Sequence, residues 1–149
     1  MLQITREGEY AFRAVLYLAS RPVGLLSRVS EIAEAAEIPS SYLSKIMRRL
    51  CAAGLVKSYR GPKGGFVLAR PAESITLREA IEAVEGPISS NPRLVAKGGR
   101  GPGKGFALHP VWEEAQRSFL DVLGARTIAD ISKDGEAIRD RAGLKKVGP

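Results

Sequence analysis

The residues most suggestive of chemistry are lysines and arginines that occur together without acidic neighbours. No aspartate or glutamate lies between Glu37 and Glu73, whereas seven basic residues do: Lys45, Arg48, Arg49, Lys57, Arg60, Lys63 and Arg70. Most of the net charge of +7 lies in the same half of the chain, because residues 1–70 hold 11 lysines and arginines against 5 acidic residues. Such a block favours a polyanionic partner, nucleic acid first and an anionic membrane surface second. A solvated basic surface without a partner is the other interpretation that charge alone permits.

Other kinds of chemistry find little support in the sequence. The single cysteine, Cys51, excludes a disulfide within the chain and a multi-cysteine metal site. We expect it to be a small buried apolar residue, with a redox-sensing thiol as the alternative. The single histidine, His109, has no triad partners and is expected to cap or pack a helix rather than to bind metal. Residues 98–105 resemble a phosphate-binding loop, but a glycine follows Lys104 where magnesium binding needs serine or threonine.

The composition is that of a soluble globular protein. The chain has 149 residues, of which 44% are apolar and 26% are charged. Its longest wholly apolar run, Ala14–Ala19, has six residues, whereas a membrane-spanning helix needs about 20. No signal-peptide pattern is visible, and a single cysteine suits a reducing compartment. We therefore expect a cytoplasmic protein of one domain, or of one domain with a short extension.

The segments expected to position the basic residues begin with three helices. A first helix is predicted over residues 5–20, and Ser30 can cap a second, short helix. A proline ends the second helix, and a third helix starts at Ser40 or Ser41 and stops before Gly54. Four apolar residues of the third helix have the spacing of one buried face: Leu43, Ile46, Met47 and Leu50. Its opposite face is then small, polar and basic.

A hairpin and a fourth helix are expected next. Residues 55–59 and 66–70 have the pattern of two strands. The glycine-rich run 61–65 can join them, because such a turn needs backbone freedom at positive φ. Thr76 and Glu79 then form a capping box that opens the fourth helix.

The remainder of the chain divides into a loop, a helix and a tail. Residues 87–108 are predicted to be a glycine-rich basic loop, and residues 132–149 a polar tail. Between them, residues 109–131 hold a long helix and a short one, with Pro110 in the first turn of the long helix. The long helix carries an apolar stripe of Trp112, Ala115, Phe119, Val122 and Leu123. This stripe is expected to pack either within the chain or against a second chain.

The order of helices and hairpin in residues 1–86 predicts a winged helix-turn-helix, mainly α with a small two-stranded β wing. A helix fits the major groove of duplex DNA, and small side chains at its N-terminus let the backbone approach base edges. On the third helix, we expect DNA contacts from Ser40, Ser41, Lys45, Arg48 and Arg49. On the hairpin turn, we expect them from Arg60, Gly61, Pro62, Lys63 and Gly64, at the minor groove or its phosphates.

Several short segments carry a more specific pattern. They read TREGEYA at 5–11, IPSSYL at 38–43, GLV at 54–56, RGPKGGF at 60–66 and HPVW at 109–112, together with the helix at 76–84. In these segments the chain resembles, over residues 2–131, the bacterial winged-helix regulators typified by the iron–sulfur cluster regulator, the nitric-oxide-sensing repressor and the cysteine-metabolism repressor. The resemblance implies a homodimeric transcription regulator on a partly palindromic operator, with the long helix pairing with its twin. It also implies DNA contacts by Ser41, Tyr42, Ser44 and Lys45, and a minor-groove role for Arg60.

The sequence departs from the cluster-binding regulators at one point. Those proteins carry three cysteines before the long helix, and the corresponding positions here hold Leu94, Arg100 and Phe106. Iron–sulfur clusters need thiolates, or rarely imidazoles. We therefore predict that the protein holds no iron–sulfur cluster and no other cofactor.

The leading hypothesis is a sequence-specific, dimeric DNA-binding regulator and not an enzyme. Its signal would be a small molecule, a partner protein or the Cys51 thiol. The second hypothesis is a protein-interaction module that docks an acidic partner through the winged helix and the basic loop, with DNA binding incidental. A third is an enzyme that holds a phosphorylated substrate in the glycine-rich loop.

Overall fold

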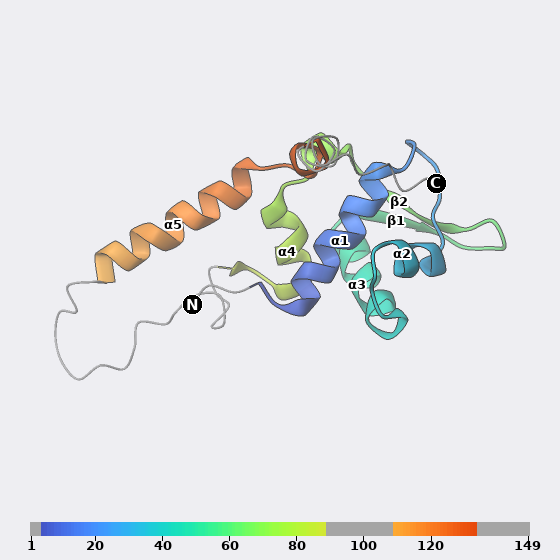
Figure 1. Ribbon diagram of the computed structural model, residues 1–149, viewed down its shortest axis with the longest axis horizontal. Helices are drawn as coiled ribbons and strands as arrows, with labels where there is room; N and C mark the ends of the chain where they lie inside the picture. Colours follow the sequence, from blue (N-terminus) through green and yellow to red (C-terminus); the bar gives the residue numbers. More distant parts are fainter. Residues whose placement is uncertain (1–3, 89–108, 134–149) are drawn as a thin grey trace, which may run out of the picture.

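The computed structural model describes residues 4–88 and 109–133, and Figure 1 shows the order of their elements. The helices are α1 (Arg6–Ser20), α2 (Val29–Ala35), α3 (Ser40–Ala52), α4 (Leu77–Glu85) and α5 (His109–Ala125). The strands are β1 (Val56–Tyr59) and β2 (Gly65–Leu68), and a short 3-10 helix, η1 (Ala72–Ser74), precedes α4. Residues 128–133 are helical as well. The mainly α fold with a two-stranded wing is confirmed, while the predicted loop and tail lie largely outside the described residues.

The first helix has the predicted bounds. Thr5 is its N-cap, and the Thr5 hydroxyl oxygen accepts the N–H of Gly8 at 3.2 Å. The buried residues of α1 include Ala11, Ala14 and Leu18, which belong to the main core of the protein. None of the helices in the described ranges is long and apolar enough to cross a bilayer.

The second helix starts earlier than expected, so the prediction that Ser30 caps it is wrong. Its N-cap is Arg28, whose backbone N–H donates to Glu31 Oε2 at 2.7 Å. The cause is a contact distant in sequence, because Ser27 is bridged to Phe66 of β2 by two backbone hydrogen bonds of 2.9 and 2.8 Å. This bridge keeps the chain extended up to Ser27, and α2 begins directly after it.

The third helix packs as its apolar spacing predicts. Leu43, Ile46, Met47 and Leu50 are each at most 1% exposed and join the main core. Gly54 follows the helix with φ of +75°, the left-handed conformation that stops a helix at low cost only with glycine. The burial of one face leaves the opposite face of α3 at the surface.

The wing is an antiparallel pair with Val56 opposite Leu68 and Tyr59 opposite Gly65. The first strand starts one residue later than predicted, and the second starts one residue earlier and ends two residues earlier. Only glycine fits at position 65, because the Cβ atom of any other residue would lie 2.6 Å from the carbonyl oxygen of Ser27. The wing is therefore fastened at its base to the start of α2.

The last described segments return to the domain formed by the first 86 residues. Thr76 caps α4 in a capping box with Glu79, as predicted. After α5, the backbone of residues 126–128 pairs with residues 75–77, and the Ile128 side chain is completely buried in the main core. The C-terminal part of the described chain is thus tied to the entrance of α4.

A single carboxylate links the end of α4 to the start of α1. Glu85 Oε1 accepts the backbone N–H of Thr5 at 2.9 Å and also the Thr5 hydroxyl. A Cβ atom on Gly8 would lie only 2.1 Å from the same Glu85 oxygen. Gly8 therefore leaves the space that the Glu85 carboxylate occupies beside the first turn of α1.

This contact predicts that Gly8→Ala destabilises the protein, although alanine favours helices over glycine by about 1 kcal/mol. The added methyl group displaces Glu85, and hydrogen bonds to charged groups contribute about 1.5–3 kcal/mol. We expect a net loss of about 1–2 kcal/mol in urea unfolding.

The same substitution in a Glu85→Ala background provides the control. There the carboxylate is gone, so we expect Gly8→Ala to be neutral or to stabilise by up to about 1 kcal/mol. Stabilisation by Gly8→Ala in the otherwise unchanged protein would contradict a structural role for the Thr5–Glu85 contact.

Candidate nucleic-acid interface

The outer face of α3 exposes most of the polar residues predicted to contact DNA. Ser40, Ser41, Ser44, Lys45 and Arg48 are exposed. Pro39 stands at the N-cap, and no side chain caps this end of α3. Since the first amides of a helix lack intrahelical acceptors, this end is suited to bind an anionic oxygen such as that of a phosphate.

Tyr42 lies on the same face and is held by an aromatic neighbour. Its ring contacts the Tyr10 ring of α1 edge to face, with 5.9 Å between centroids, and the residue is 41% exposed. This contact restrains the start of α3 against α1. Tyr42 thus belongs to an exposed face whose other members are small or charged.

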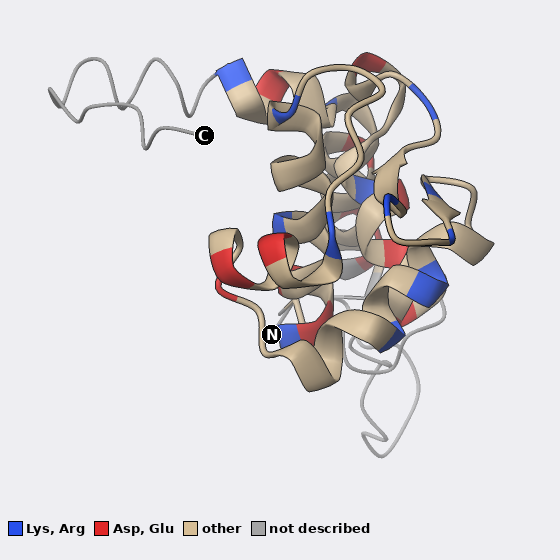
Figure 2. Cartoon of the chain, turned by 90° about the vertical axis from the view of Figure 1, so that its right-hand side faces the viewer, with Lys and Arg blue, Asp and Glu red and all other residues tan. Residues whose placement is uncertain are grey.

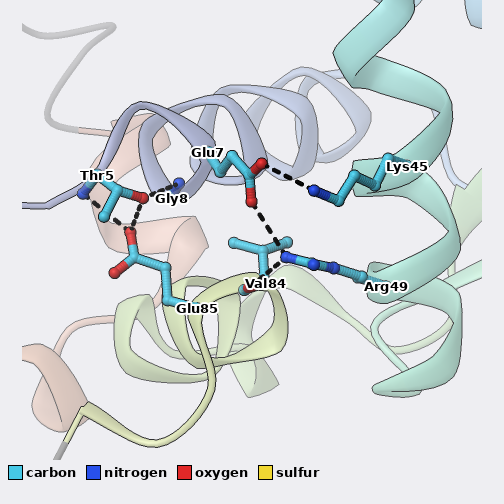
Figure 3. A network of polar contacts seen from close by, with 7 residues as sticks. All are labelled: Thr5, Glu7, Gly8, Lys45, Arg49, Val84 and Glu85. Carbon is cyan, nitrogen blue, oxygen red and sulfur yellow. Dashed lines mark hydrogen bonds and ion pairs between the residues drawn. The ribbon is translucent and has the colours of Figure 1, made fainter. Parts of the chain in front are cut away.

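Two of the predicted cations are engaged with an acidic residue of α1. Glu7 places one carboxylate oxygen 3.1 Å from Lys45 Nζ and the other 3.1 Å from an Arg49 guanidinium nitrogen (Figure 3). Arg49 also donates to the Val84 carbonyl oxygen at the end of α4. Arg49 therefore connects three helices and is half-buried, whereas its neighbour Arg48 is exposed.

The wing turn presents Arg60, Gly61, Pro62 and Lys63 at the surface. Gly61 has φ of +110°, a conformation that other residues rarely adopt. Gly64 is half-buried, and a Cβ atom there would lie 2.1 Å from the Tyr59 carbonyl oxygen. The glycines thus allow a tight turn that exposes the two basic side chains.

Sequence reasoning missed one cation of this region, Arg28. Its guanidinium donates to the Pro62 carbonyl oxygen of the wing turn at 3.2 Å, and the residue is exposed. Arg28 lies outside the acid-free block and close in sequence to Glu31 and Glu34, so its charge did not stand out. The bridge from Ser27 to Phe66 carries it to the wing.

The charges of this region are mixed rather than uniformly basic. Figure 2 looks onto the end of the molecule that carries the wing and shows lysines and arginines on several elements, with acidic residues among them. Glu7 lies outside the acid-free block between Glu37 and Glu73 and reaches α3 from the first helix. No sequence signal connects it to Lys45, 38 residues away.

Cys51 is half-buried and packs against the main core. Burial raises the pKa of its thiol, and a hydrogen bond with Ser58 only partly opposes this shift. A thiol with a raised pKa is mostly protonated at neutral pH and reacts slowly with oxidants. The expected structural role is therefore better supported than the redox-sensing alternative.

The described part of the chain contains no cluster of residues that could bind a metal ion. In residues 4–88 and 109–133, no three histidine, cysteine or acidic side chains lie close enough to hold a metal ion. The positions Leu94, Arg100 and Phe106 and the glycine-rich run 98–105 lie outside these ranges, and the side chain of His109 is not described.

The predicted apolar stripe of α5 is partly packed within the chain and partly exposed to solvent. Phe119 and Leu123 pack on Ile81 and Ile88 within the chain. Val122, in contrast, is 60% exposed, as is Val111, and Ala115 is exposed too. The side chain of Trp112 is outside the described set. In Figure 1, α5 extends away from the other helices, and Val111, Ala115 and Val122 are uncovered in the single chain.

Comparisons with known proteins agree on one group. Residues 4–134 match the Rrf2 family, described as an iron-dependent transcriptional regulator. A putative HTH-type transcriptional regulator of Mycobacterium tuberculosis, MT1325, is 31% identical over 131 residues, which cover 88% of this chain and 81% of that protein.

Solved structures give the same result. The global cysteine regulator CymR of B. subtilis superposes with a TM-score of 0.75 at 27% identity, covering 89% of this chain and 98% of that one. T. potens IscR superposes with a TM-score of 0.70 at 30% identity, covering 93% and 91%. The predicted resemblance is confirmed by both kinds of comparison.

Proposed function

The chain belongs to the Rrf2 family of transcriptional regulators, and we propose from this premise that it binds duplex DNA sequence-specifically through α3 and the wing. The observation that carries the proposal is the outer face of α3. It combines an uncapped helix N-terminus, the small exposed residues Ser41 and Ser44, and the exposed cation Arg48. Small residues let the helix enter a groove, and the amides and cations meet the phosphates at its edges.

The wing supplies the second contact in this proposal. Arg60 and Lys63 project from a glycine-supported turn, and Arg28 bonds to the backbone of the same turn. An arginine can enter a narrow minor groove, where the negative potential is enhanced. We assign Arg60 to the minor groove and Lys63 to the neighbouring phosphates.

We further propose that the active form is a homodimer on a partly palindromic operator. The exposed apolar residues of α5, Val111, Ala115 and Val122, support pairing with a second copy, because a contiguous apolar patch on a protein surface commonly marks an interaction site. A two-fold dimer presents two copies of α3 and the wing to two half-sites.

The family description names iron, but the donors of this chain do not fit a cluster. Its one cysteine, Cys51, is half-buried on α3 and packs against the core, far in sequence from the positions at which the cluster-binding relatives carry cysteines. One histidine cannot replace three thiolates. We therefore propose that this regulator works without an iron–sulfur cluster.

DNA binding is tested by affinity measurements on duplexes selected from a random pool. If Arg28, Arg48 and Lys63 of both protomers meet phosphates, affinity should fall about a hundredfold or more between 50 and 200 mM salt, because counterions are released on binding. Arg60→Ala should weaken a selected duplex by about 1–3 kcal/mol and random DNA much less.

Lys133→Ala is the matched control, since it removes one exposed cation outside α3 and the wing. It should leave the preference for the selected duplex unchanged. An affinity that does not respond to salt, or an equal loss on both duplexes with Arg60→Ala, would overturn the proposed contacts.

Absence of a cluster is tested by anaerobic reconstitution with iron and sulfide, beside a cluster-binding relative treated in the same way. We expect iron and acid-labile sulfide well below one per chain, with no visible absorbance band. Stoichiometric iron and sulfide that survive gel filtration would show that the chain finds ligands other than thiolates.

A further inference from the structure

The contact between Glu7 and Lys45 joins an acidic residue to the centre of the DNA-facing surface. Lys45 lies on the exposed face of α3, its side chain is 50% exposed, and its Nζ is 3.1 Å from Glu7 Oε1. The Glu7 side chain is 31% exposed, so the pair is accessible from solvent. A negative charge therefore occupies a place where phosphate oxygens are expected.

The Glu7 carboxylate is held in this place rather than free to move away. Its second oxygen accepts from Arg49, which is itself fixed by the Val84 carbonyl oxygen (Figure 3). One guanidinium nitrogen of Arg49 thus donates to both Glu7 and the Val84 carbonyl oxygen, and these contacts keep Glu7 beside Lys45. Lys45 has no such second contact among the polar contacts recorded in the described residues, so it is the member of the group that DNA can recruit.

A phosphate and Glu7 compete for the same ammonium group. Both are anions, and they repel each other when both stand beside Lys45. A phosphate that gains Lys45 must therefore separate it from Glu7 or approach against the carboxylate charge. On random DNA only phosphate contacts are available, and no other contact offsets the energy lost when Lys45 leaves Glu7. On the operator, contacts to base edges do.

We propose that Glu7 is a specificity-determining residue that withholds Lys45 from the phosphates of random DNA. The inference rests on the proposed function, because it concerns how α3 and DNA interact. Glu7 lies outside α3 and the wing, and its negative charge increases specificity at a surface that carries several cations. Discrimination arises from a contact that wrong sequences fail to replace.

The chain offers a matched control for the charge of Glu7. Glu9 lies two residues further along α1, about 200° around the helix, and pairs with Arg13 instead of α3. Glu9→Gln therefore makes the same change in net charge as Glu7→Gln without releasing a cation of α3. Glutamine in place of Glu7 can still accept from Arg49, so α1, α3 and α4 should remain packed.

The experiment measures binding of the full chain to a random-sequence duplex by fluorescence anisotropy over a series of salt concentrations. Glu7→Gln should make the slope of log affinity against log salt steeper by about 0.9 for each protomer that touches DNA, the value for one added phosphate contact. At roughly 0.1 M salt, affinity for random DNA should rise about five- to tenfold per protomer. Glu9→Gln should leave the slope unchanged.

Lys45→Met separates this proposal from a purely structural role for Glu7. In the unchanged background it should leave the slope on random DNA as it is, because Lys45 is already withheld. Combined with Glu7→Gln, it should return the slope to the original value. On a selected duplex, Lys45→Met should weaken binding, and Glu7→Gln should reduce the ratio of selected to random affinity.

The results also separate this inference from the proposed function. If the unchanged protein binds DNA with salt dependence but Glu7→Gln leaves the slope on random DNA unaltered, the role of Glu7 is refuted and the regulator remains. The same holds if Lys45→Met alone flattens the slope on random DNA. If the unchanged protein shows no salt-dependent binding to any duplex, both proposals fall together.

Discussion

The burial of one face of α3 is the constraint on which the rest of the molecule depends. Leu43, Ile46, Met47 and Leu50 are enclosed by the core, and this fixes the rotation of the helix about its own axis. The residues between them then face outward, so helical periodicity alone places the serines and cations of α3 at the surface. Packing in the core thus decides which side chains of α3 face outward, whatever their charge.

Polar contacts then fix the other elements relative to α3. Glu85 joins α4 to the N-terminus of α1, and Glu7 joins α1 to α3. The bridge between Ser27 and Phe66 fastens the wing to α2. The contacts of Glu85 and Glu7 are partly exposed and contribute modestly, whereas Ser27 is completely buried. Together these contacts determine the relative positions of helix and wing that a groove of DNA would meet.

Local signals in the sequence were sufficient for elements whose ends are decided locally. The Thr5 cap, the capping box at Thr76 and the stop at Gly54 depend on residues within one turn of the helix end, and all were predicted. Local rules failed at Ser30, because a backbone pairing with a strand nearly 40 residues later sets the start of α2. Glu7 and Arg28 were missed for the same reason, since their partners lie 38 and 34 residues away.

Contact of DNA with the outer face of α3 and the wing turn can be tested residue by residue in solution. Backbone amide resonances should be followed by NMR while a selected duplex is added. We expect the largest shift changes at Ser41, Ser44 and Gly61, with little change at Glu31 and Glu34 on the acidic helix α2. Changes concentrated on α2 or on α5, with α3 and the wing unaffected, would contradict this expectation.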